Sequence, residues 1–436
     1  MKNKLTKNFR SKILLSNACK SKVALLLFSF MPALLTAQDA SGKNFVRLGV
    51  SQINITPTQP VIMSGYDARK TPSTGIHDSL FASALFFSGE QNKALLISAD
   101  MIGFPFAFVD SLKNSIAVKT GLPSDHIMLI ATHDHGGPAI HTYEPELPPA
   151  NEDYIQTLKE KLIAVATDAM KDPQPFSMGV GKGKCDLNIN RRAVFADGGV
   201  WLGRNPDGIC DHELDVIKFA DTKNNLIALL INWPCHGTTM GQDNYKITGD
   251  WPASAARFIR KLSGKNIVVA VTAGASANIN PIYGPGNDFN EDEAVGYHVA
   301  NETWKVIDQI KTSPVTSINF VNTSLSFPGK KAWTDQFPQT SVPTGSDVDI
   351  RLTGLKVDDV VLCGISGELM TEIGLQVKKQ SPYRNTIMIT HCNGLTGYIC
   401  TDKSFTEGGY ETKVSHLMPG VEQPLVKKCL DMIHSF

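Results

Sequence analysis

The chain has 436 residues, of which 42% are hydrophobic and 19% are charged. This composition supplies enough apolar side chains for a sizeable core and excludes a largely disordered protein. Basic and acidic residues balance at 42 each, but residues 1–37 hold seven basic residues and no acid, which leaves 35 basic against 42 acidic residues in 38–436. A mildly acidic body lacks the basic face that phosphate binding needs, so we expect no nucleic-acid partner.

The first 37 residues have the pattern of a secretory signal peptide. Seven basic residues precede an apolar run, Val23–Leu35, and the small residue Ala37 follows it. The run has 13 residues, fewer than the ~20 that a membrane-spanning helix needs. An uncleaved N-terminal anchor is the alternative. We therefore expect cleavage near Ala37 and an exported chain, periplasmic or secreted, with no transmembrane segment and with peripheral membrane contact left open.

The cysteine pattern argues against a zinc finger or a thioredoxin-type site. No Cys-x-x-Cys pair occurs, and the odd number of cysteines after residue 37 cannot be fully paired. A bridge between Cys185 and Cys210 is one interpretation. Burial of most of these residues as small apolar side chains is the favoured one.

Apolar runs with strand character alternate with helical patterns along the chain. The predicted strands are Val46–Ile55, Phe81–Phe87, Ala94–Ala99, Ile127–Ala131, Leu226–Trp233, Ile267–Thr272, Val360–Ile365 and Thr386–Thr390. The predicted helices are Ala107–Lys119, Asn151–Lys171 (capped by Asn151), Pro252–Leu262, Glu291–Lys311 and Glu368–Lys379. Val315–Phe327 reads as extended, and residues 337–349 as a polar surface loop. The alternation predicts an α/β fold, with mixed, largely parallel β-sheets flanked by helices.

Polar side chains follow five of the predicted strands. In open α/β sheets, ligands bind beyond the carboxyl ends of the strands. These positions hold two histidine motifs, an amide-rich stretch, a glutamate and a further histidine that a tyrosine follows: His133-Asp134-His135, Pro234-Cys235-His236, Asn278-Ile279-Asn280, Gly367-Glu368 and His391-Cys392-Asn393 with Tyr398. We therefore expect the active site at these strand ends.

Two histidines and a carboxylate suit zinc with an open position for water. His-x-His alone is weak, because metallo-β-lactamase-like enzymes and TIM-barrel amidohydrolases also use it. The first would place Asp-His two residues on, where Gly137-Pro138 stand, and the second usually has the pair on its first strand. Taken singly, His133 and His135 could be loop histidines, His236 a core histidine and Glu368 a helix N-terminal acid. Only their joint placement favours a metal site.

A series of motifs, in this order, resembles the neutral/alkaline non-lysosomal ceramidase family, N-terminal catalytic domain, over roughly residues 46–415. The motifs are Gly65-Tyr66, Gly75-Ile76-His77, Ser98-Ala99-Asp100, Ala131–Pro138, Asn188-Ile189-Asn190-Arg191, Asn232–His236, Gly367-Glu368 and Tyr398-Ile399. The resemblance implies a zinc amidase that cleaves ceramide into sphingosine and fatty acid. It also implies one Zn²⁺ per chain and a small-molecule or lipid substrate with an acyl amide.

The resemblance also implies roles for individual residues. The zinc ligands would be His133, His236, Glu368 and Tyr398. His135 would face the substrate and help to move protons, Arg191 would lie near the site, and Tyr410 would hydrogen-bond the reacting centre.

Two features depart from the family pattern. Asn280 stands where the family has a serine implicated in catalysis. It cannot act as a nucleophile, but it can donate a hydrogen bond to an oxyanion. The chain also ends at Phe436, before the further β-sandwich domain of the family, so we expect residues 38–436 to form a single zinc-hydrolase domain.

Three other functions are compatible with the sequence. The same zinc site could hydrolyse another amide, ester or lactone, such as an acylated sugar or amino lipid. A non-catalytic periplasmic binding protein would use the fold without the chemistry. Ser276 could be a serine-hydrolase nucleophile, although Gly274-Ala275-Ser276-Ala277-Asn278 lacks the second glycine of a nucleophile elbow.

Overall fold

The computed structural model describes residues 45–141, 147–331 and 343–436. The predicted signal peptide and the first part of the predicted loop 337–349 lie outside these ranges. Within them, no helix has both the length and the apolar character that crossing a membrane requires.

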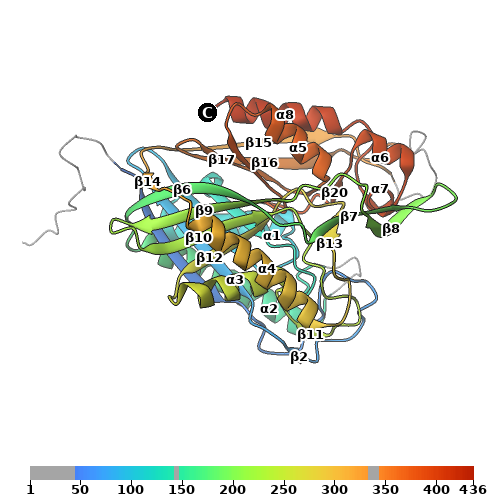
Figure 1. Ribbon diagram of the computed structural model, residues 1–436, viewed down its shortest axis with the longest axis horizontal. Coiled ribbons are helices and arrows are strands. Elements are labelled where there is room, and N and C mark those ends of the chain that lie inside the picture. The colour runs from blue at the N-terminus through green and yellow to red at the C-terminus, as the bar shows by residue number, and fades with distance from the viewer. Residues whose placement is uncertain (1–44, 142–146, 332–342) are drawn as a thin grey trace, which may run out of the picture. The chain divides into compact units, whose positions relative to one another are not determined.

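The largest sheet has nine strands in the order β12-β10-β9-β6-β1-β3-β4-β5, with β14 beside β6 (Figure 1). Their bounds are β1 (Arg47–Asn54), β3 (Phe81–Ser88), β4 (Lys93–Ala99), β5 (Ile127–Ala131), β6 (Gln174–Lys184), β9 (Glu213–Asp221), β10 (Leu226–Trp233), β12 (Val268–Ala273) and β14 (Ser313–Pro314). The sheet curls so that β12, at one end of the strand order, lies against β3 and β4. Ser83 of β3 and Ser98 of β4 donate hydrogen bonds to the carbonyl oxygens of Val269 and Val271 of β12.

A second sheet has four strands in the order β15-β16-β17-β19. They are β15 (Ile318–Phe327), β16 (Val348–Val357), β17 (Val360–Ile365) and β19 (Asn385–Ile389). Short strands form three smaller sheets: β2 (Gly75–Ile76) with β11 (Lys246–Ile247), β13 (Ile279–Pro281) with β7 (Asn188–Val194) and β8 (Val200–Asn205), and β18 (Glu368–Leu369) with β20 (Tyr398–Ile399).

The predicted class, mixed β-sheets flanked by helices, is confirmed, but the expected predominance of parallel pairs is corrected. In the two large sheets only β4·β5, β10·β12 and β17·β19 are parallel, and the remaining pairs are antiparallel. The strands of these three pairs are buried along most of their length, so they appear in the sequence as continuous apolar runs. The prediction therefore found the parallel strands and missed several of the antiparallel ones.

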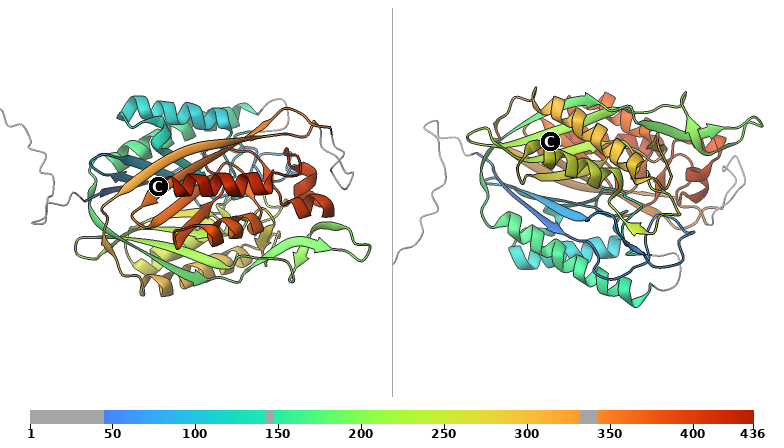
Figure 2. Two further views of the ribbon diagram at one scale, coloured as in Figure 1. Left: turned by 90° about the horizontal axis from the view of Figure 1, so that it is seen from above. Right: turned by 60° about the horizontal axis from the view of Figure 1, so that its bottom comes forward.

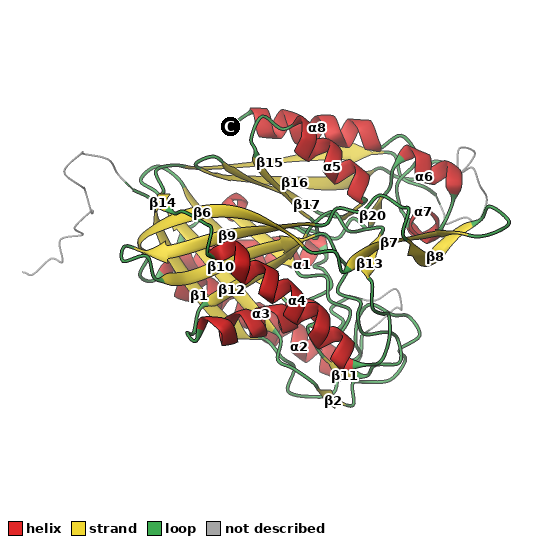
Figure 3. Ribbon diagram, in the orientation of Figure 1, coloured by secondary structure: helices red, strands yellow, loops and turns green. Residues whose placement is uncertain are grey.

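Pairs of helices cover the outer faces of the sheets, as Figures 2 and 3 show. One apolar cluster joins α1 (Phe106–Thr120) and α2 (Pro149–Met170) to β3, β4 and β5; another joins α3 (Asp250–Ser263) and α4 (Phe289–Ile307) to β9, β10 and β12. A third packs α5 (Thr371–Gln380) and α8 (Glu422–His434) on the four-stranded sheet. The innermost cluster lies between the two large sheets. The short helices are η1 (Ser124–His126), α6 (Asp402–Glu407) and α7 (Tyr410–Val414).

Strand β6 carries glycine at three alternate positions, Gly179, Gly181 and Gly183, because α4 and the segment after it pack against that face. A Cβ atom at Gly179 would lie 2.2 Å from the carbonyl oxygen of Lys311, and one at Gly181 would lie 2.6 Å from Val306. Phe176, Met178 and Val180 alternate with these positions and face the inner core, so the apolar pattern of the strand is limited to three side chains on one face. No element was predicted between residues 172 and 225, although β6 to β9 occupy this stretch.

The close approach at β6 predicts that Gly179→Ala destabilises the protein. The added methyl group meets backbone rather than a movable side chain, so we expect a loss of about 1–3 kcal/mol in the free energy of unfolding, the usual cost of overpacking. Gly75→Ala is the matched control, because a Cβ atom there meets nothing within 4 Å. Chemical denaturation of both variants checks this; equal midpoints would contradict the packing argument.

Two expectations about local structure have different outcomes. Asn151 does not cap α2: the helix starts at Pro149, and the Asn151 side chain is buried in the first turn. There it accepts a hydrogen bond from the Ile62 amide and donates to the carbonyls of Ile62 and Ala139. Proline fits the first helical position because its missing N–H has no partner there. All seven cysteines of the described residues are free and six are buried, as favoured, so Cys185 and Cys210 are not bridged.

Candidate metal centre

The carboxyl ends of the three parallel strand pairs meet at one place. A bridge joins Asp134, after β5, to Gly237, after β10. The Ala131 amide donates to the carbonyl of His391, after β19, and the Thr390 amide donates to the carbonyl of Ala273 at the end of β12. The loops that carry the predicted site residues are therefore held together by backbone hydrogen bonds.

Three histidines turn Nε2 toward this region, because a hydrogen bond at Nδ1 fixes the orientation of each ring. The Nδ1 atoms of His133, His135 and His236 donate hydrogen bonds to the carbonyls of Ile102 (2.8 Å), Gly65 (3.1 Å) and Ser276 (2.8 Å), respectively. Because a carbonyl can only accept, Nδ1 carries the proton and Nε2 is the ring nitrogen that keeps a lone pair. Such contacts commonly orient histidines that bind metals.

Two backbone positions are shaped around these histidines. Gly65 has φ +98°, and a Cβ atom there would lie 2.5 Å from the His135 ring. His133 itself has φ 63°, which is uncommon for a residue with a side chain. Glycine in the Gly65-Tyr66 motif therefore allows the close approach to His135.

Glu368 of β18, which follows β17 of the four-stranded sheet, completes the cluster. The parallel pair β18·β20 sets Glu368 directly opposite Tyr398. Glu368 Oε2 lies 3.5 Å from His133 Nε2 and 3.3 Å from His236 Nε2, is buried and makes no hydrogen bond among the described residues. Three lone-pair atoms that face one another in a buried space repel unless a cation lies between them. The donor set, two imidazoles and a carboxylate, therefore fits zinc.

The pKa shifts match the protonation states that metal binding requires. Burial, helped by Arg191 and His133, lowers the pKa of His236 to about 4. Burial also lowers the pKa of His135 well below its usual value. Burial alone would raise the pKa of Glu368, but positive charge at His133 and His236 outweighs it and holds this pKa well below the usual range. With neutral imidazoles, a metal ion between them would supply that charge. Neutral imidazoles and an ionised carboxylate are the ligand forms.

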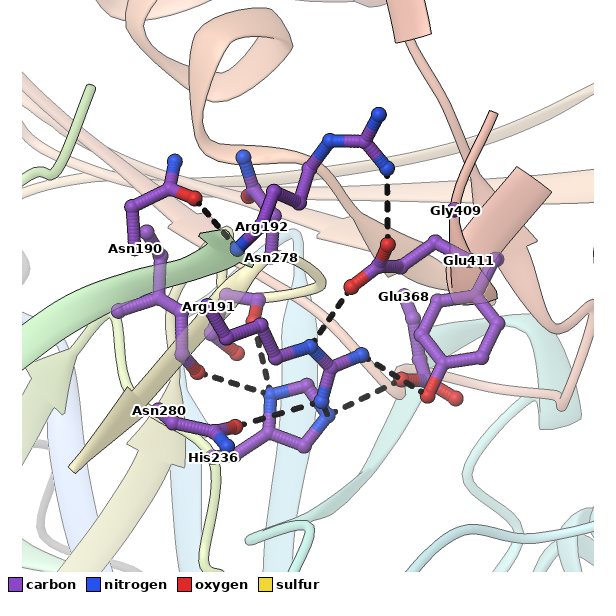
Figure 4. A network of polar contacts seen from close by, with 12 residues as sticks. Asn190, Arg191, Arg192, His236, Asn278, Asn280, Glu368, Gly409 and Glu411 are labelled. Atoms are coloured by element: carbon purple, nitrogen blue, oxygen red, sulfur yellow. Dashed lines mark hydrogen bonds and ion pairs between the residues drawn. The ribbon is translucent and has the colours of Figure 1, made fainter. Parts of the chain in front are cut away.

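Arg191 of β7 connects the cluster to the residues around it (Figure 4). Its Nε donates to Glu411 Oε1 (2.7 Å), and its Nη2 donates to Tyr398 Oη (3.2 Å). Its Nη1 lies 3.2 Å from His236 Nε2 and 3.3 Å from Asn280 Oδ1. The pairing of β13 with β7 places Asn280 opposite Ile189, which explains why Asn280 comes close to Arg191.

The two tyrosines lie on the same side of the cluster. The ring centroid of Tyr410 is 5.8 Å from that of Tyr398 and 5.9 Å from the Arg191 guanidinium carbon. Burial and then the charge of Glu368 raise the pKa of both phenols, while Arg191 opposes this shift. The phenols therefore tend to stay protonated without a cation beside them.

The prediction placed His391 at a strand end but gave it no role, and it gave no role to Glu411. Glu411 accepts hydrogen bonds from Arg191 and Arg192, and its pKa is held low because the two guanidiniums outweigh burial. His391 stacks on His133 with ring centroids 3.7 Å apart and an angle of 12°, and neither of its ring nitrogens has a hydrogen-bond partner among the described residues. An ion bound through a ring nitrogen lies close to the plane of that ring, so two rings stacked face to face, with separate planes, are poorly placed to share one ion. His391 thus supports the His133 ring.

Both residues had a signal in the sequence. His391 directly follows the predicted strand Thr386–Thr390, and Glu411 follows Gly408-Gly409-Tyr410. Ser276, by contrast, lacks the base that a serine nucleophile needs: its Oγ is buried and has no hydrogen-bond partner among the described residues.

The fold and these side chains define an α/β protein with a buried histidine–carboxylate site of the kind that holds a catalytic metal. The family described as neutral/alkaline non-lysosomal ceramidase, N-terminal, matches residues 46–280, more than half of the sequence. The chain belongs to this family. The matched stretch includes His133, His135, Arg191, His236 and Asn280, whereas Glu368, Tyr398 and Tyr410 lie beyond it.

Several neutral ceramidases are similar to the chain. The one from Pseudomonas aeruginosa is 23% identical over 416 residues, which cover 84% of this chain and 61% of the relative. The one from Drosophila pseudoobscura pseudoobscura is 26% identical over 55% of this chain and 35% of its own length. Neutral ceramidase A from Dictyostelium discoideum is 27% identical over 47% of this chain and 30% of its own length. The chain thus spans about three fifths or less of these relatives.

Solved structures share the fold. The crystal structure of the Pseudomonas aeruginosa neutral ceramidase has a TM-score of 0.75 at 16% identity and covers 89% of this chain and 74% of its own. A structure described as ceramidase complexed with C2 has a TM-score of 0.76 at 16% identity, over 89% of this chain and 75% of its own.

Proposed function

We propose that this chain is a zinc-dependent amidohydrolase of the neutral ceramidase type, which cleaves the amide of ceramide or a similar N-acylated lipid into an amine and a fatty acid. The single observation that carries the proposal is the convergence of His133 Nε2, His236 Nε2 and Glu368 Oε2 in one buried space. The family and the neutral ceramidase relatives supply the reaction class. We further propose that residues 38–436 form one hydrolase domain of an exported protein, periplasmic or secreted.

In this proposal one zinc ion per chain is held by His133, His236 and Glu368, with Tyr398 as the fourth ligand. When bound, zinc polarises a carbonyl oxygen and lowers the pKa of a bound water towards ~7. Arg191 Nη2 lies 3.2 Å from Tyr398 Oη and offsets part of the rise in the phenol pKa, and a zinc ion bound beside the phenol would supply the further positive charge that favours the phenolate.

His135 would move the protons of the reaction. Its Nε2 lies 3.4 Å from His133 Nε2 and so faces the reacting centre, and burial keeps the imidazole neutral. A neutral imidazole can accept a proton from the attacking water and then donate it to the amine nitrogen as the C–N bond breaks.

Arg191, Tyr410 and Asn280 would stabilise the negative charge that develops on the carbonyl oxygen. Arg191 is positioned by Glu411, and Asn280 turns its Oδ1 to Arg191 and Thr238, which leaves its Nδ2 free to donate. Fixed donors of this kind typically contribute ~10²–10³-fold each to the rate.

Fatty-acid release from labelled ceramide in detergent, by purified mature protein, tests the proposal. We expect about one zinc per chain, turnover that a chelator removes, and recovery when zinc is added back. Protein that neither retains zinc nor turns over an acylated substrate would overturn it and would favour a non-catalytic binding protein.

The second candidate is the same zinc site acting on a different amide, ester or lactone, such as an acylated sugar or amino lipid. Asn280 favours it, because this residue replaces the serine implicated in catalysis in the family and lies at the site, 3.3 Å from Arg191. Zinc-loaded protein that leaves ceramide intact and hydrolyses one of these substrates would establish it.

A further inference from the structure

Exposed apolar side chains are concentrated on one projecting hairpin. Among the described residues, five of the eleven exposed large hydrophobic residues lie on β7, β8 and the segment that follows, and their exposed fractions run from 40% at Leu202 to 65% at Val194. We call this set the apolar hairpin: Val194, Phe195, Trp201, Leu202 and Ile209. Contiguous exposed apolar surface on a folded protein usually marks an interaction site.

Two further exposed residues, Ile282 and Tyr283, are tied to the apolar hairpin. Arg204 of β8 donates hydrogen bonds from Nε to the Ile282 carbonyl and from Nη2 to the Gly284 carbonyl, each at 3.0 Å. The remaining four of the eleven lie elsewhere on the chain: Ile76, Val118, Leu262 and Tyr297. The concentration is therefore specific to this part of the fold.

The apolar hairpin is exposed on both faces of a two-stranded ribbon. The pairs Arg192↔Leu202 and Val194↔Val200 share one face of β7·β8, and Ala193↔Trp201 lies on the other. The ribbon extends past the neighbouring elements in Figures 1 and 2. A protein partner would contact one face, whereas a lipid layer surrounds an inserted ribbon on both.

The apolar hairpin is continuous with the candidate metal centre. Arg191 and Val194 are on the same strand, and at ~3.3 Å per residue they lie ~10 Å apart. The Trp201 ring is 6.0 Å from the Tyr410 ring, and Lys413 Nζ lies 5.7 Å from the Trp201 ring. Tryptophan with a nearby cation is typical of side chains at a membrane–water interface.

We propose that the apolar hairpin inserts into the surface of lipid aggregates and so holds the metal centre against the layer that contains the substrate. The inference rests on the proposed lipid substrate. An N-acylated lipid with long chains resides in membranes or micelles. Insertion of the hairpin would place the lipid surface next to Arg191, which is on the same strand, and next to Tyr410, whose ring lies 6.0 Å from that of Trp201.

Flotation of the purified mature protein, residues 38–436, with phosphatidylcholine vesicles tests the inference without requiring turnover. We expect the wild type to float and Phe195→Asp/Ile209→Asp to lose at least tenfold in vesicle affinity. Val118→Asp/Leu262→Asp, at exposed apolar residues on α1 and α3, is the matched control and should float like the wild type. Brominated acyl chains should quench tryptophan fluorescence in the wild type and much less in Trp201→Phe.

A second measurement separates this inference from the proposed function. Phe195→Asp/Ile209→Asp should hydrolyse a short-chain, water-soluble N-acyl substrate at the wild-type rate and vesicle-embedded substrate at least tenfold more slowly. Vesicle binding by a protein without amidase activity would support the hairpin and reject the proposed function. Absence of flotation, unchanged affinity of the double variant, or a wild-type dimer that the double variant converts to monomer would overturn the inference, the last by identifying a contact between copies.

Discussion

Replacing Glu368 with alanine should remove the bound metal and the amidase activity together. Glu368 is the only carboxylate in the proposed ligand set, and its Oε2 lies within 3.5 Å of both histidine Nε2 atoms. Because a catalytic metal contributes several kcal/mol to the transition state, we expect a loss of about 10³-fold or more in kcat/KM. Zinc content by mass spectrometry and turnover, measured on the same sample, check the result.

Two control variants show whether the loss of zinc and activity in Glu368→Ala comes from the missing metal ligand or from a disturbed fold. Glu368→Gln keeps the shape and removes the charge, so it should weaken zinc binding without disturbing the fold. Glu372→Ala removes a nearby carboxylate that accepts a hydrogen bond from Asn278, and it should retain zinc. A Glu368→Ala protein that is fully metallated and active would exclude Glu368 as a ligand.

Glu411→Gln should be among the most destabilising single substitutions in the chain. Glu411 Oε1 accepts from Arg191 at 2.7 Å and Oε2 accepts from Arg192 at 2.9 Å, with all three side chains buried (Figure 4). Removal of the carboxylate leaves the buried Arg191 guanidinium without a carboxylate partner and leaves Arg192 with the partly exposed Glu407 alone, for which we expect a loss of about 3–5 kcal/mol in the free energy of unfolding. Urea denaturation at neutral pH measures it.

Glu407→Gln is the matched control for this ion pair. Glu407 also contacts Arg192, at 3.2 Å, but its side chain is 34% exposed. A solvated pair contributes about 0–1 kcal/mol, so this variant should lose little stability. Equal unfolding midpoints for the Glu407 and Glu411 variants would contradict the assignment.

The pH dependence of the Glu411 effect has a defined sign. The pKa of Glu411 is lowered in the folded protein because Arg191 and Arg192 outweigh burial. Its contribution is therefore fully present above the pKa of an unfolded glutamate and is lost as the pH falls through the folded-state pKa. The stability difference between wild type and Glu411→Gln should shrink in acid.

The sequence predicted best the strands that are buried along most of their length. Ile127–Ala131, Leu226–Trp233 and Val360–Ile365 have the same bounds in the structure as in the prediction. Strand β6 was missed although Phe176, Met178 and Val180 alternate along it, because glycines stand at the positions where α4 and the segment after it pack. The packing that requires these glycines comes from residues more than 100 positions later, so no local pattern indicates it.

The sequence predicted those residues of the candidate site that stand just after the ends of buried strands. His133, His236 and Glu368 stand two or three residues after the ends of apolar runs, and the structure brings them together. Glu411 follows no strand, and its partner Arg191 lies 220 residues earlier, so no local pattern relates them. The catalytic and ligand roles of the site residues remain predictions from the motifs.

The donor set is divided between the two large sheets, and this division affects folding. His133 and His236 follow strands of the nine-stranded sheet, Glu368 follows a strand of the four-stranded sheet, and Arg191 and Tyr398 are 207 residues apart. Contacts of such long range form late and slowly. A metal ion bound by residues from both sheets would have to be released before the two sheets could separate. Removal of the metal by a chelator should therefore accelerate amide hydrogen exchange at the ends of β10 and β17.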